Sequence, residues 1–80
     1  MALVVEFTVE PFVEGSPGPH VQAALDAATS SGLDVEFGPF GTHVSGHDDA
    51  QVLAALDQVV RAAVAAGATR VASQISRPDV

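Results

Sequence analysis

One six-residue pattern occurs twice in this chain, and both copies stand in the same local context. Val21–Asp26 reads VQAALD, and Val52–Asp57 reads VLAALD. A β-like stretch precedes each copy, and a glycine (Gly32 or Gly67) followed by a strand-like segment comes after it. The apolar residues have the spacing of an amphipathic helix, and glycine commonly follows a helix C-terminus. The sequence therefore predicts the element order βαββαβ.

The order βαββαβ is that of the ferredoxin-like fold. We therefore expect an α+β sandwich, in which a four-stranded antiparallel sheet carries both helices on one face. A chain of 80 residues is enough for one domain. We expect a single domain over residues 1–80, with a frayed tail at 77–80. The second face of the sheet is left without helices, so it must meet solvent, a ligand or another subunit.

Charge and composition limit the classes of partner. The chain has ten acidic residues, three arginines and no lysine, so its net charge is −7. Such a surface repels phosphate backbones and anionic lipids. We therefore expect no nucleic acid and no membrane as partners, and a small cationic metabolite fits better. Without cysteine there is no thiolate metal site or thiol nucleophile. No signal-like or membrane-spanning stretch stands in the sequence, which indicates a cytoplasmic protein.

The predicted strands assign side chains to the two faces of the sheet. Leu3–Phe12 alternates with a period of two, which is typical of a half-buried strand, and Pro11 should end its pairing. In the second strand, Leu33–Phe37, we assign Phe37 to the core. In Thr42–His47 the orientation stays open, although Val44 favours the even-numbered residues inside. With the last strand at Arg70–Ile75, the open face is expected to collect Glu6, Thr8, Glu10, Glu36, Ala72, Gln74 and Ser76.

The two helices have recognisable boundaries. For the first, Ser16 followed by Pro17 resembles an N-cap with proline at the first helical position, although Pro19 leaves the exact start open. His20 stands in the first turn of this helix and is expected on the surface. For the second, either Asp48 or Asp49 can cap the N-terminus. The apolar stripe of the second helix is expected to consist of Val52, Leu53, Leu56, Val59, Val60, Ala63 and Val64.

Residue types that carry chemistry are present, but their spacing does not favour catalysis. His43 and His47 would lie about 13 Å apart in one strand, too far to share a metal ion. Glu6 and Glu10 are separated in the same way, so a catalytic carboxylate pair is not expected either. No nucleophile motif occurs in the chain. We therefore expect no enzyme activity, no metal and no cofactor.

Two segments resemble the small thiamine-binding protein family. They are the run EFTVEP at Glu6–Pro11 and the pattern SGLxxExxPxGTxVxG at Ser31–Gly46. The family is similar to each half of the tandem-domain proteins that bind thiamine and its hydroxymethylpyrimidine moiety. The resemblance covers residues 3–77. It implies a ferredoxin-like domain that forms dimers or tetramers through its sheets, and a binding role in thiamine salvage, transport or buffering. Ser45 replaces a usual acidic residue of the family, and His43 replaces an aliphatic one.

The open face and the resemblance together yield a set of candidate ligand contacts. An acidic face suits the thiazolium cation, and an aminopyrimidine can pair with carboxylate, hydroxyl and amide groups. The candidates are Glu6, Thr8, Glu10, Ser16, Glu36, Thr42 and Gln74, with Phe12 and Phe40 as candidate covers for a ring. The alternative is an oligomeric structural or regulatory module, whose open face forms a subunit interface and holds no metabolite.

Overall fold

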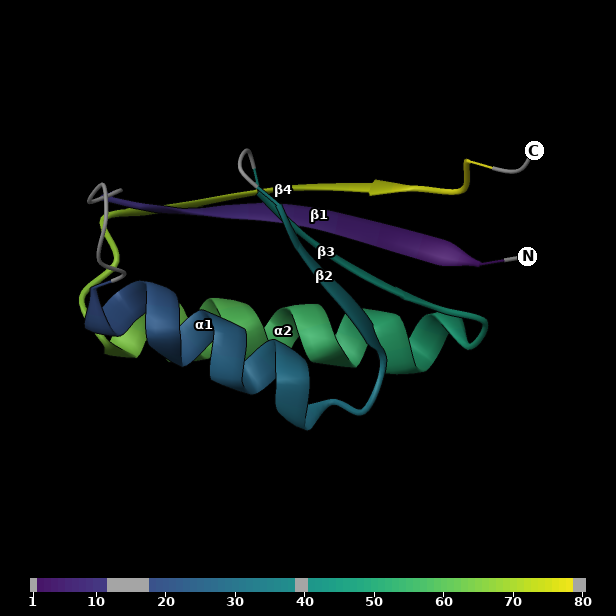
Figure 1. Ribbon diagram of the computed structural model, residues 1–80, viewed down its shortest axis with the longest axis horizontal. Helices are drawn as coiled ribbons and strands as arrows, with labels where there is room; N and C mark the ends of the chain where they lie inside the picture. Colours follow the sequence, from purple (N-terminus) through teal and green to yellow (C-terminus); the bar gives the residue numbers. More distant parts are fainter. Residues whose placement is uncertain (1, 12–17, 39–40, 79–80) are drawn as a thin grey trace.

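The computed structural model describes residues 2–11, 18–38 and 41–78. The elements in order are β1 (Leu3–Glu10), α1 (Pro19–Ser30), β2 (Asp34–Gly38), β3 (Gly41–Gly46), α2 (Asp49–Ala65) and β4 (Arg70–Ser76). The strands form one antiparallel sheet in the order β2-β3-β1-β4. Both helices cover the same face of this sheet, and the other face is open (Figure 1). The predicted ferredoxin-like βαββαβ fold is confirmed. No helix in the described ranges is long and apolar enough to cross a membrane.

The alternating strand β1 lies in the interior of the sheet, between β3 and β4. Its odd-numbered residues from Leu3 to Val9 are buried beneath the helices, while Thr8 and Glu10 are exposed on the open face. This is the predicted assignment. The strand ends at Glu10 because Pro11 has no N–H for a sheet hydrogen bond.

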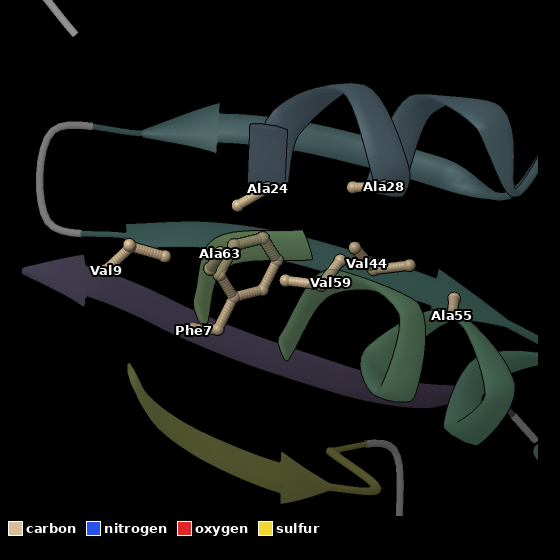
Figure 2. Packing of buried hydrophobic residues seen from close by; sticks show 8 residues of the cluster. All are labelled: Phe7, Val9, Ala24, Ala28, Val44, Ala55, Val59 and Ala63. Atoms are coloured by element: carbon tan, nitrogen blue, oxygen red, sulfur yellow. The ribbon is translucent and has the colours of Figure 1, made fainter. Parts of the chain in front are cut away.

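Small side chains bring the helices onto the sheet. Ala24 and Ala28 of α1 and Ala55 and Ala63 of α2 are buried. The Phe7 ring points from β1 toward this helical layer (Figure 2). The core residues in this cluster are Phe7, Val9, Ala24, Ala28, Val44, Ala55, Val59 and Ala63. Alanine leaves room for a close approach of helix and sheet, so one aromatic ring and a few valines fill the space.

The start of α1 differs from the prediction. Gly18 is the N-cap and Pro19 occupies the first helical position, so the predicted N-cap at Ser16 is wrong; Ser16 itself lies outside the described residues. His20 is buried rather than on the surface, and its Nε2–H donates to the Pro11 carbonyl oxygen at 2.5 Å. A Cβ on Gly18 would lie 2.7 Å from the His20 ring. The His20 imidazole ring therefore occupies the space that a side chain at position 18 would need, and glycine at that position leaves it free.

The start of α2 decides between the two predicted caps. The Asp48 carboxylate accepts hydrogen bonds from the backbone N–H groups of Ala50 and Gln51 at 2.9 and 3.3 Å, so Asp48 is the N-cap. Asp49 instead accepts two hydrogen bonds from the Arg77 guanidinium, at 2.8 and 3.2 Å. These bonds lower the pKa of Asp49 and raise the pKa of Arg77. The pair ties the residue after β4 to the beginning of α2.

Three large apolar side chains are more exposed than predicted. Leu53 and Val64 were placed in the core stripe of α2, but 45% and 59% of their surfaces are exposed. A helix turns about 100° per residue, so these two side chains lie on the flank of the buried stripe. Phe37 was assigned to the core and is 65% exposed. It lies on the outer strand β2, at the edge of the sheet.

Shortening a fully buried valine of α2 should destabilise the fold much more than shortening an exposed one. We expect Val59→Ala to lower the free energy of unfolding by about 2 kcal/mol, because it leaves a cavity in the core. Val64→Ala, in the same helix, is the matched control and should cost less than about 0.5 kcal/mol. Chemical denaturation at one dilute protein concentration measures both. Equal losses would mean that the buried face of α2 is wrongly assigned.

Candidate functional site

A cavity of about 280 Å³ lies where the β2–β3 hairpin, the second half of β1 and the first half of α1 meet. We call it the hairpin pocket. Its lining residues are Phe7, Thr8, Val9 and Glu10 of β1, Val21, Ala24 and Leu25 of α1, and Phe37, Gly38, Gly41 and Thr42 of the hairpin strands. Small-molecule sites are mostly apolar with a few polar groups, and their volumes start at roughly 300 Å³. The hairpin pocket has this composition and is of the size that suits a small metabolite.

The pairing of β1 explains where the pocket forms. β3 pairs with β1 only as far as Phe7 opposite Thr42, whereas β4 follows β1 to Glu10. The last three residues of β1 therefore have a sheet neighbour on one side only, within the described residues. At the junction, a Cβ on Gly41 would lie 3.1 Å from the Phe7 carbonyl oxygen. Glycine lets β3 approach β1 closely at this point, just before the pocket opens.

The side chain of Thr42 provides a polar group inside an apolar wall. Thr42 faces the helices and only 4% of its surface is exposed. Its hydroxyl has no hydrogen-bond partner among the described residues. Among the described residues, no fully buried side-chain nitrogen or oxygen lacks a hydrogen-bond partner. Because the Thr42 hydroxyl has no partner, its oxygen is not fully buried and is accessible to solvent. The hairpin pocket, which Thr42 lines, provides that access, and the hydroxyl is available to a ligand there.

Glu10 also belongs to the lining, although its side chain leaves β1 on the open face of the sheet. Glu10 is exposed at the end of β1, and its Oε2 lies 3.6 Å from the Arg70 Nε. An exposed ion pair of this length is weak, so the carboxylate can exchange one cation for another. Thr8, two residues earlier, is also exposed and also lines the pocket. Three predicted site residues, Thr8, Glu10 and Thr42, thus line one pocket, but the side chains of Thr8 and Glu10 leave the sheet on the opposite face from that of Thr42.

The remaining described candidates lie in a row on the open face. In the sheet register, Glu36 of β2 is opposite His43, His43 is opposite Glu6, and Glu6 is opposite Gln74 of β4. His43 Nε2 lies 2.6 Å from Glu6 Oε2, and both side chains are a little under half exposed. Thr42 faces the opposite side of the sheet from this row. The predicted site set is therefore divided between the two faces.

Some parts of the site were not predicted from the sequence, and some predictions cannot be placed. Ser16, Phe12 and Phe40 lie outside the described residues. The apolar lining from α1, Val21 and Leu25, was not predicted as part of a site, because helical periodicity does not distinguish a core wall from a pocket wall. Of the described residues, no three His, Asp or Glu side chains are grouped so that they could hold a metal ion.

The structure defines a ferredoxin-like α+β domain with a small, mostly apolar pocket beside its β2–β3 hairpin. The chain belongs to the thiamine-binding protein family, whose model matches residues 5–79. No protein with a curated description matches the chain.

Solved structures share the fold. A domain of unknown function from Bacillus cereus is 25% identical, with a TM-score of 0.71, and the match covers 99% of this chain and 79% of that one. A hypothetical protein from Methanocaldococcus jannaschii is 24% identical, with a TM-score of 0.69 and coverage of 99% and 84%. A candidate thiamine biosynthesis/salvage protein from Thermotoga maritima is 22% identical, with a TM-score of 0.57 and coverage of 95% and 81%.

The free Thr42 hydroxyl leads to a stability prediction. Thr42→Val removes the hydroxyl and keeps the shape of the side chain, and no internal hydrogen bond is lost. We therefore expect the free energy of unfolding to change by less than about 1 kcal/mol, because the substitution leaves no buried donor or acceptor of another residue without its hydrogen bond. Thr42→Ala, which also removes a buried methyl group, should cost more. A loss of several kcal/mol in Thr42→Val would show that the hydroxyl serves the fold.

Proposed function

We propose that this protein binds thiamine or its hydroxymethylpyrimidine moiety in the hairpin pocket. It acts in the cytoplasm in thiamine salvage, transport or buffering, without a catalytic step and without a cofactor. The observation that carries the proposal is the Thr42 hydroxyl, which has no internal partner and lines a pocket in a chain of the thiamine-binding protein family.

The chemistry of the pocket suits the two rings of thiamine in different ways. A flat aminopyrimidine fits between the apolar walls supplied by Phe7, Val21 and Leu25, and its polar edge can pair with the Thr42 hydroxyl. The thiazolium carries a permanent positive charge and is attracted by the Glu10 carboxylate. The walls thus select a ring, and the polar groups orient it.

The charge of the protein favours the unphosphorylated forms of the ligand. The chain carries a net charge of −7, and Glu10 adds a local negative charge to the pocket lining. A diphosphate brought to this site would be repelled. We therefore propose thiamine or the free pyrimidine as the ligand, rather than thiamine diphosphate.

Calorimetric titration tests where the ligand binds. We expect saturable binding of thiamine to the wild-type protein and an affinity about tenfold lower in Thr42→Val, the value of one lost hydrogen bond. Gln74→Ala, a polar change on the open face, is the control and should bind as the wild type does. If Glu6→Gln and Glu36→Gln weaken binding while Thr42→Val does not, the ligand lies on the open face. Absence of heat in a folded protein would favour the module that binds no metabolite.

A second variant tests the attraction for the cation. Glu10→Gln should weaken thiamine binding by up to about fivefold, since exposed charge pairs contribute roughly 0.2–1 kcal/mol. The loss should shrink at high salt, where exposed charges are screened. Binding of uncharged hydroxymethylpyrimidine should change little. Glu36→Gln removes the same charge from the exposed surface of β2 and is the matched control. Equal effects of the two substitutions would indicate a general effect of net charge.

A further inference from the structure

Phe37 is both a lining residue of the hairpin pocket and an exposed side chain. Among the described residues, the large apolar side chains with high exposure are Phe37, Leu53, Val64 and Ile75. Of these, only Phe37 lines the pocket, and 65% of its surface is exposed. Single exposed apolar residues are common on protein surfaces and need no explanation. An exposed ring in the wall of a small-molecule pocket is different, because a bound ligand would remove its apolar surface from water.

The sheet register places Phe37 in one row with two other pocket residues. Thr42 of β3 is opposite Phe7 of β1 on one side and opposite Phe37 of β2 on the other. Directly opposite residues of neighbouring strands share a face of the sheet, so all three side chains leave it on the helical side. Phe7 and Thr42 are buried there, and Phe37 is not. The Thr42 hydroxyl therefore lies between an inner and an outer phenyl group.

The spacing of this row suits one flat ring. Neighbouring strands lie about 4.8 Å apart, so β1 and β2 are separated by about 10 Å across β3. A planar ring held between two others needs about 7 Å, which is two van der Waals contacts of about 3.5 Å each. A ligand ring placed over Thr42 can thus contact a phenyl group on each side while its edge meets the hydroxyl.

The charges around the row indicate which ring of thiamine it holds. None of the three side chains is charged, and Glu36, the neighbour of Phe37 in β2, lies opposite His43 on the open face. The carboxylate of the pocket lining, Glu10, also leaves its strand on the open face. The row is therefore neutral, and it suits an uncharged aminopyrimidine better than the thiazolium cation.

We propose that Phe37 is the specificity-determining residue of the hairpin pocket, and that its ring stacks on the pyrimidine ring of the ligand and covers it from solvent. The inference rests on the proposed function and narrows it. The ligand class is a flat, uncharged aminopyrimidine, and the thiazolium adds affinity without being required. Stacking of the rings and removal of the exposed phenyl surface from water both favour the bound state.

Calorimetric titration of two Phe37 variants tests the contact. We expect Phe37→Ala to weaken binding of thiamine and of hydroxymethylpyrimidine by the same factor, about tenfold, which is within the range for alanine substitution of side chains that stack on bases. Phe37→Leu keeps apolar bulk without a flat ring and should weaken both nearly as much. Ile75→Ala shortens an exposed apolar residue of the opposite edge strand and is the control, with the affinity of the wild type.

The other outcomes separate this proposal from the proposed function. If the wild type binds and Phe37→Ala binds as tightly, the pocket stands and the role of Phe37 is overturned. A loss for thiamine alone would place the thiazolium against Phe37, and wild-type affinity in Phe37→Leu would show that bulk matters and stacking does not; either result overturns the proposal. Equal losses in Phe37→Ala and Ile75→Ala do the same. No heat with the wild type overturns the proposed function and this inference together.

A tryptophan variant reports the contact directly. The chain has no tryptophan and no tyrosine, so Phe37→Trp carries its one strong fluorophore. Acrylamide should quench the indole in the free protein, and saturating hydroxymethylpyrimidine should protect it, at an affinity close to that of the wild type. In Ile75→Trp, quenching should be the same with and without the ligand. If the bound ligand leaves the indole of Phe37→Trp as accessible to acrylamide as before, the proposal is overturned.

Discussion

The rest of the structure depends on the alternation of β1. This strand pairs with both β3 and β4, so one period-two pattern fixes the two faces of the whole sheet. Its odd-numbered residues form the floor of the core, and Glu6, Thr8 and Glu10 are directed to the open face. A shift of register by one residue would bury these carboxylates and expose Phe7. The cost of burying unpaired charge keeps the register unique.

The pocket forms because the two neighbouring strands, β3 and β4, pair with different lengths of β1. β4 pairs with β1 as far as Glu10, but β3 pairs with it only as far as Phe7 opposite Thr42. Among the described residues, no large side chain fills the gap between the hairpin and α1. A hydroxyl that would normally need a partner in the core therefore remains available.

The sequence predicted the element order, the faces of β1 and the glycines that follow both helices, because these depend on local periodicity and backbone conformation. Phe37 and Leu53 were misassigned because an apolar residue at the right parity is buried only if another element covers it, and coverage at the sheet edges is a tertiary property. His20 was misassigned because its burial depends on the carbonyl of Pro11, nine residues earlier. The hairpin pocket could not be predicted, since it arises where strand pairing stops.

The register of the outer strands has a consequence for the ends of the chain. Val4 pairs with Ser76, so the beginning of β1 and the end of β4 lie side by side at the same end of the sheet (Figure 1). Domains with adjacent termini tolerate circular permutation and insertion into other chains. A linker of a few residues could therefore join Ser76 to Leu3 and move the termini to another loop without breaking the sheet. The same proximity would allow the domain to be inserted as a module into the loop of a host protein.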